Sequence, residues 1–146
     1  MKRDGFPVAF TETYLPYPLA RASHSVSSSF HASLKGWDLS VPEWRVLACL
    51  VEADGLPVGQ LAEMVMMKQP SMTKVLDRME ADGLVRRRGA REDRRRVLIH
   101  LTPKGRARVK PVLAAARAHQ RERLAPFDEA ERALILRALR LLIGEG

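Results

Sequence analysis

The sequence has little cysteine and few aromatic residues: Cys49 is its one cysteine, and aromatic side chains occupy 5% of its 146 positions. A single cysteine excludes an internal disulfide and fits a reducing cytoplasm. Apolar runs stay short of the roughly 18 residues of a membrane span. Lys2 and Arg3 are not followed by the continuous apolar stretch of a signal peptide. We therefore expect a cytoplasmic protein that does not insert into a membrane.

Sequence signatures of catalysis are also missing. There is no glycine-rich phosphate loop, nucleophile elbow or close cluster of histidine, cysteine and carboxylate residues. His24 and His31 would lie two helical turns apart, roughly 10 Å, which is too far to share one ion without other ligands. His100 and His119 are isolated in the sequence. We expect no catalytic residues, no metal site and no cofactor.

Positive charge is what the sequence has in excess, with a formal net charge of +8 and a pI near 10.4. Residues 86–96 hold seven arginines against Glu92 and Asp93. Mutually repelling arginines usually need an anionic partner, and the planar guanidinium suits phosphates and narrow grooves better than lysine does. Nucleic acid is the leading partner, and an anionic membrane surface is the competitor. The plain alternative is a charged loop that keeps a hairpin soluble.

The N-terminal part predicts an arm and two helices. Three prolines favour an extended arm over residues 1–18, and a helix with a thin apolar stripe follows over 19–35 and ends at Gly36. A capping box at 40–43 begins a second helix that ends near residue 55. Its expected buried face consists of Trp44, Leu47, Ala48 and Val51.

The middle of the sequence predicts a helix-turn-helix followed by a hairpin. A short helix over 58–65 precedes one that begins at Gln69 and is closed by Gly83. The second helix has apolar residues at the i, i+3, i+4, i+7 spacing of a buried face. These are Met72, Val75, Leu76 and Met79. Apolar alternation predicts strands near 84–88 and 96–101, on either side of an arginine-rich tip.

The C-terminal part predicts two more helices. One starts at Thr102 and runs to about Leu124, with a kink or a break at Pro111. The other starts at a second capping box over 128–131 and ends at Gly144. Its apolar residues occupy more than one face, which predicts a homodimer, although packing within its own core would also cover them. These residues are Leu134, Ile135, Leu136, Ala138, Leu139, Leu141, Leu142 and Ile143.

The fold class that follows is mainly α with a small β-hairpin wing, an α+β winged helix-turn-helix. We expect residues 37–102 to form a DNA-binding lobe. Residues 1–36, with the arm and first helix, and residues 103–146 would supply the long helices of a dimerisation region.

Two segments resemble the MarR family of bacterial transcription regulators. Residues 93–105, DRRRVLIHLTPKG, are similar to that family's wing, which has D-x-R, an alternating strand, Leu-Thr and a glycine. Residues 69–85, QPSMTKVLDRMEADGLV, are similar to its recognition helix and the exit into the wing. The order and spacing of the elements agree over about 19–143.

The resemblance implies a DNA interface made of the recognition helix and the wing. On the helix, the exposed polar residues are the expected contacts to bases and phosphates. They are Gln69, Ser71, Thr73, Lys74 and Arg78. On the wing, Arg95 would enter the minor groove, Asp93 would hold the tip through a salt bridge, and Arg94 and Arg96 would meet phosphates. Some of residues 86–88 would meet phosphates as well.

The resemblance also implies a small-molecule effector, because family members often bind one between the dimer helices and the DNA-binding lobe. The N-terminal stretch resembles members that respond to aromatic or phenolic carboxylates, and Arg21 could pair with the carboxylate. His24, Ser25, His31 and Trp44 would line the pocket. Arg21 in a surface ion pair and Trp44 in the core are the competing interpretations.

A redox role for the thiol is not expected. The redox-sensing branch of the family has its cysteine in the first helix, where this chain has serines. Cys49 lies on the second helix among apolar residues, which favours a buried structural thiol.

The sequence therefore predicts a homodimeric, site-specific transcriptional regulator, a repressor by the family's usual mode, that binds a pseudopalindromic operator and is released by a ligand. The alternative is a winged-helix module for non-specific nucleic-acid packaging or protein assembly.

Overall fold

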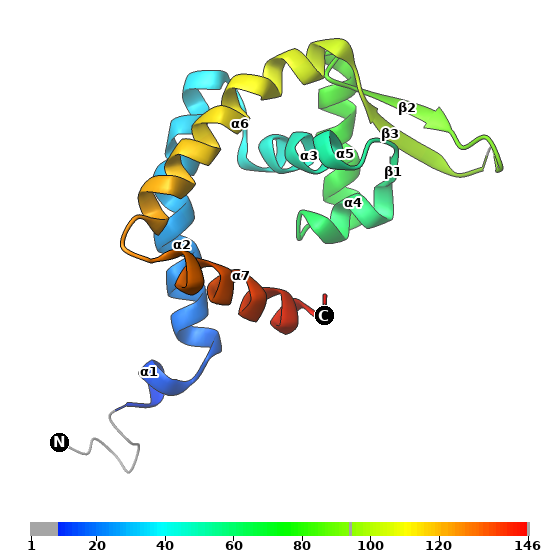
Figure 1. Cartoon of the computed structure of the whole chain (residues 1–146). Coiled ribbons are helices and arrows are strands. Elements are labelled where there is room, and N and C mark those ends of the chain that lie inside the picture. The colour runs from blue at the N-terminus through cyan, green and yellow to red at the C-terminus, as the bar shows by residue number, and fades with distance from the viewer. Residues whose placement is uncertain (1–8, 94, 146) are drawn as a thin grey trace. The chain divides into compact units, whose positions relative to one another are not determined.

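The computed structural model describes residues 9–93 and 95–145. They fall into two compact units, residues 1–113 and 114–146, which are described separately. Helix α6 contributes to both units. Figure 1 labels the α-helices and the strands. The elements are α1 (Phe10–Thr13), α2 (Pro16–Ser33), the 3-10 helix η1 (Leu34–Trp37), α3 (Val41–Glu52), β1 (Leu56–Pro57), α4 (Val58–Met64), α5 (Gln69–Ala81), β2 (Val85–Gly89), β3 (Val97–Leu101), α6 (Pro103–Leu124) and α7 (Glu129–Ile143). The mainly α fold with a small β wing is confirmed.

The N-terminal arm differs from the sequence prediction. Residues 1–8 lie outside the described residues, but the expected extended conformation is wrong for the rest of the arm, because α1 spans 10–13 and α2 already begins at Pro16. A proline in the first helical turn has no amide to leave unpaired, so it is compatible with a helix start. Gly36 does not end the helix either. The chain continues through η1, and Asp38 closes it in the left-handed region at φ 53°.

Helix α3 begins as the sequence predicts and buries a different face. The Ser40 hydroxyl accepts a hydrogen bond from the Glu43 amide (3.3 Å), and the Glu43 carboxylate accepts one from the Ser40 amide (2.8 Å). The buried residues include Val46 and Leu50 beside the expected Leu47, whereas Trp44, Ala48 and Val51 are only half-buried. The reason is that α4, α5 and β3 all pack around this helix.

The turn between α4 and α5 contains an unusual backbone conformation. Met66 has φ 60°, in the left-handed region that favours glycine. The amide of Met66 donates to the Glu63 carbonyl (3.1 Å), and the Met67 amide donates to the Ala62 carbonyl (2.9 Å). This is the pattern that closes many helices, with the left-handed residue just past the end. A side chain there costs on the order of 1 kcal/mol.

Helix α5 buries Met72, Leu76 and Met79 as predicted, while the expected Val75 is only half-buried. The wing that follows is a hairpin of β2 and β3 in which Val85 pairs with Leu101 and Arg87 with Ile99. The sequence did not predict β1, which adds to β3 as a third antiparallel strand in the order β1-β3-β2. A strand of two residues leaves no alternation to read.

The start of α6 is packed closely onto the end of α5. The Thr102 hydroxyl accepts a hydrogen bond from the Gly105 amide (2.9 Å) and donates to the Gly83 carbonyl, so the expected helix cap is confirmed. A Cβ at position 105 would stand 2.1 Å from the Leu84 carbonyl oxygen, which only glycine avoids. The helix then runs unbroken through Pro111, so the alternative of a break there is wrong.

The second unit consists of the end of α6 and α7. Asp128 and Glu131 form the predicted capping box (2.8 and 2.9 Å), and Gly144 ends the helix at φ 90°. The Arg132 side chain donates to the Leu124 carbonyl across the connecting turn (3.1 Å). None of the residues of α7 is buried. Among the described residues, no helix has the length and apolar character to cross a membrane.

Candidate nucleic-acid interface

Helix α5 presents a polar face opposite its buried one. Gln69, Ser71, Thr73, Lys74 and Arg78, the residues predicted to contact DNA, are all exposed. The Thr73 hydroxyl donates to the Gln69 carbonyl (3.1 Å), so its remaining capacity is as an acceptor. Because one side of the helix is fixed in the core, the other side can enter a major groove without rearrangement.

The wing tip is held by hydrogen bonds to the backbone. The Asp93 carboxylate accepts from the Arg95 amide (2.9 Å), and the Asp93 carbonyl accepts from the Arg96 amide (3.0 Å). Within the described part of the chain, Asp93 has no ion pair, and its short carboxylate makes a side-chain turn with its own backbone. The expected salt bridge stays a prediction. Arg95 and Arg96 are exposed. The predicted phosphate contact Arg94 lies outside the described residues.

The three arginines of β2 point to different faces of the hairpin. The Arg87 guanidinium lies 2.7 Å from the Asp77 carboxylate and 3.2 Å from that of Glu80, and the Arg87 amide donates to Glu80 (2.9 Å). Arg86 and Arg88 are exposed on the opposite face. Because side chains alternate along a strand, Arg87 contacts α5, whereas Arg86 and Arg88 face away from it and can bind an external anion.

Sequence reasoning missed this ion pair and a second charged cluster. Asp54 accepts a hydrogen bond from the Leu101 amide (2.9 Å) and lies 3.2 Å from the Arg106 guanidinium and 3.6 Å from His100 Nδ1. It joins the end of α3 to β3 and α6. The acidic spacing of Asp77 and Glu80 on one helix face was a usable signal for the first cluster, whereas nothing near Asp54 in the sequence indicates the second.

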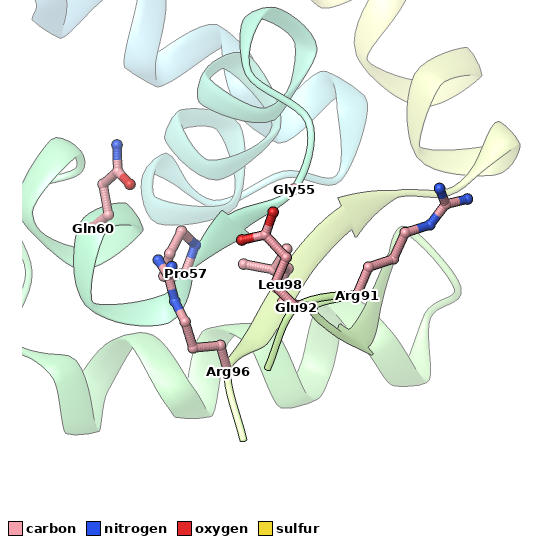
Figure 2. A pocket seen from close by; sticks show the side chains of 8 residues that line it. Gly55, Pro57, Gln60, Arg91, Glu92, Arg96 and Leu98 are labelled. Carbon is pink, nitrogen blue, oxygen red and sulfur yellow. The ribbon is translucent and has the colours of Figure 1, made fainter. Parts of the chain in front are cut away.

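A hollow of about 480 Å³ lies between the wing, β1 and α4. Pro57 and Leu98 give it an apolar floor, and charged side chains from the wing tip surround it. Figure 2 shows that Arg91 and Arg96 point in different directions, with Arg96 on the side of Pro57. The tip thus presents positive charge on more than one side, as a hairpin between two rows of phosphates would require.

The predicted effector residues form two groups. Arg21, His24 and Ser25 are exposed on α2, and the Arg21 guanidinium carbon lies 5.9 Å from the centre of the Tyr17 ring. His31 and Trp44 are half-buried near the start of α3. Ten residues separate Arg21 from His31, which is about 15 Å along a helix. A small ligand that touched all of these residues in one protomer would have to span most of this rise, and a shared pocket stays a prediction.

The half-buried group has identifiable partners. Trp44 contacts Phe30 edge to face, with ring centres 5.3 Å apart. Burial and the nearby Arg45 charge lower the pKa of His31 below its usual value, which favours the neutral imidazole.

Cys49 is half-buried on α3. Burial, and next the negative charge of Glu52, raise the pKa of its thiol above the usual value. A protonated thiol is a poor nucleophile, which is consistent with a structural role.

The order of α3, α4, α5 and the β2-β3 wing, with an exposed recognition helix beside a basic hairpin, defines the class of winged helix-turn-helix proteins. The profile of the MarR family matches residues 39–97. A MarR family transcriptional regulator of solved structure, from Silicibacter pomeroyi DSS-3, is 39% identical, covers 92% of this chain and 98% of its own, and superimposes with a TM-score of 0.80. The chain belongs to the MarR family, whose members are DNA-binding transcriptional regulators and not enzymes.

Two other relatives carry information in their names. The homoprotocatechuate degradative operon repressor of Escherichia coli is 34% identical over 64% of this chain and 63% of its own length. A MarR family protein from Mycobacterium tuberculosis, solved in complex with salicylic acid, is 27% identical, covers 95% of this chain and 98% of its own, with a TM-score of 0.70. The chain spans about half to just under two thirds of the length of the first curated relatives that it matches.

Proposed function

We propose that this protein is a homodimeric transcriptional repressor that binds a pseudopalindromic operator in double-stranded DNA. The observation that carries the proposal is the Arg87 contact with Asp77 and Glu80. This contact fixes the basic wing to α5, whose free face is polar. The helix for the major groove and the wing for the minor groove are therefore held in a fixed position relative to each other. The tip arginine Arg95 enters the minor groove, and Arg96 with Arg86 and Arg88 meets phosphates.

The dimer is proposed from α7. Leu139 and Leu142 belong to a set of apolar residues on α7 that face solvent in one chain. A second copy covers apolar surface of this kind most simply through a two-fold axis, which places two recognition helices about one turn of DNA apart. Repression is supported by the name of the Escherichia coli relative.

An effector with an aromatic ring and a carboxylate is proposed from the salicylic acid complex of the Mycobacterium relative. Because about 15 Å of helix rise separates Arg21 from His31, we assign them to the two ends of the effector-binding region. Arg21 with His24 and Ser25 forms an exposed group that would pair with a carboxylate, and His31 with Trp44 forms a half-buried one suited to the ring.

The experiment is a fluorescence-anisotropy titration of the DNA upstream of the protein's own gene, against a scrambled duplex of equal length at one near-physiological salt concentration. Site-specific regulators prefer their site by roughly a thousandfold or more. Equal affinity for this DNA, for operators selected from a random library and for scrambled DNA would reject the proposal in favour of a packaging or assembly module.

The same titration tests Arg95. Arg95→Ala should weaken binding by about tenfold or more with an unchanged melting temperature, because the side chain is exposed and its loss removes a groove contact. Arg121→Ala on α6 removes the same charge outside the interface and is the matched control. If both variants lose affinity equally, the Arg95 side chain contributes only net charge.

A further inference from the structure

Met66 is the most exposed large apolar side chain among the described residues, at 77%. It occupies the turn that joins α4 to α5, three residues before α5 begins. Its neighbours Val65 and Met67 are buried and half-buried, so they anchor the turn to the lobe. The backbone hydrogen bonds of the turn do not involve the Met66 side chain.

Neither the backbone conformation nor the burial of Met66 explains a methionine at this position. With φ 60°, the backbone of Met66 is in a region where a side chain is unfavourable and glycine is not. The side chain also leaves an unbranched apolar group in water. Residues in such backbone conformations cluster at functional sites, so Met66 is a candidate for a role outside the fold.

The location of Met66 limits what that can be. The residues that follow it, Lys68, Gln69 and Ser71, are exposed at the N-terminal end of α5. Residues near that end of a recognition helix reach base edges, and Met66 precedes this end by three residues. The chemical complement of a flexible apolar side chain in a major groove is the C5-methyl group of thymine.

We propose that Met66 contacts thymine methyl groups in the operator and contributes to sequence specificity, an inference that rests on the proposed DNA-binding function. The left-handed backbone at Met66 is unfavourable for folding, and the apolar contact with thymine adds to the polar contacts that α5 makes with DNA. Replacement of Met66 by glycine should therefore weaken specific binding without a loss of stability.

The test begins with in vitro selection of duplexes from a random library by the wild-type protein. Affinity for the best duplex is then measured with each thymine replaced in turn by uracil, which lacks only the methyl group. We expect at least one replacement to weaken wild-type binding by about threefold to tenfold. The same replacement should have no effect on Met66→Gly or Met66→Ala, which have no apolar side chain of that length.

Two further measurements keep the interpretation sharp. Met66→Gly should leave the melting temperature unchanged or raise it slightly, because the greater freedom of glycine in the unfolded chain offsets much of the relieved backbone strain. Its affinity for the selected duplex should fall. Asp38→Gly is the matched control, because Asp38 also has a positive φ, 53°, at the end of a helix. It should not weaken DNA binding.

The possible failures are distinguishable. If no duplex is enriched, the proposed regulatory function fails and this inference fails with it. If a duplex is enriched but wild type and Met66→Gly respond identically to every uracil, Met66 does not read thymine. A change in sedimentation without a change in DNA affinity would assign the side chain to a protein contact and would also overturn the proposal.

Discussion

The two compact units of the chain differ in how much of their apolar surface they bury. Every buried apolar residue among those described lies between Phe30 and Val112, in the first unit. In the second unit, α7 has no buried residue, and Ile143 remains 70% exposed. Helix α3 in the first unit and α7 in the second both begin with a complete capping box, so local helix signals do not distinguish the two units. The difference shows that a regular, capped helix can form in a chain that does not itself bury the apolar side chains of that helix.

The largest expected effect tests whether the first unit depends on the close approach of Gly105, on α6, to the backbone of Leu84. Gly105→Ala would place a Cβ 2.1 Å from the Leu84 carbonyl oxygen. We expect a loss of roughly 3 kcal/mol or more in the free energy of unfolding, or about 6 to 12 °C in melting temperature. Gly36→Ala, which meets nothing within 4 Å, is the control and should change stability little. Similar melting temperatures for both variants would show that α6 can shift away from β2.

The next effect concerns the second unit. Replacement of Leu139 and Leu142 by aspartate should convert the proposed dimer to a monomer in sedimentation velocity, because desolvating two carboxylates in an apolar interface is costly. The melting temperature should also lose its dependence on protein concentration. Met64→Asp changes an exposed apolar residue of α4 and should leave the oligomeric state unchanged. A double variant that still sediments as a dimer would place the interface elsewhere.

A smaller effect tests the link between the wing and α5. Arg87→Lys keeps the charge and loses the fork that reaches both Asp77 and Glu80. Because these groups are partly exposed, we expect a stability loss of at most about 1 kcal/mol. An equal loss in binding energy would lower DNA affinity by about fivefold. Arg121→Lys on α6, outside the proposed interface, is the control. Equal affinities for the two variants would mean that the wing does not need this anchor.

The smallest effect concerns Cys49. A raised thiol pKa means that the protonated form dominates near neutral pH, so alkylation by iodoacetamide should be slow in the folded protein and faster after denaturation. Ser23→Cys in a Cys49→Ser background places a thiol on the exposed part of α2 and should react quickly. Cys49→Ser should leave any response of DNA binding to peroxide unchanged. Loss of such a response would assign Cys49 a redox role.

Much of the fold could be predicted because its signals are local. Capping boxes at Ser40 and Asp128, the spacing of Met72, Leu76 and Met79, and the alternation after Arg96 each act within a few residues. The prediction failed where packing or a helix start overrides composition. Pro16 and Pro18 indicated an extended arm and instead begin α2, and Trp44 indicated a core that is centred on Val46 and Leu50.

The candidate site was predictable in its membership and less so in its geometry. The exposed residues of α5 and the tip arginines follow from periodicity and charge. The partners of Arg87 and Asp54 do not, because each ion pair joins segments whose distance depends on the assembled lobe. Met66 was missed for another reason. The conflict between its side chain and its backbone exists only once the dihedral angle is known.

The engagement of Arg87 has a consequence for how salt should act on DNA binding. Arg87 is already paired with carboxylates, so it does not neutralise a phosphate and displaces no counterions from the DNA. It therefore adds nothing to the dependence of affinity on ionic strength. Each phosphate contact contributes about 0.9 to the slope of log K against log salt. The share of the slope that the segment 86–96 of each protomer contributes should therefore count only its outward arginines and fall short of its seven formal cations. Ionic strength would then measure how many of these charges the fold leaves available to DNA.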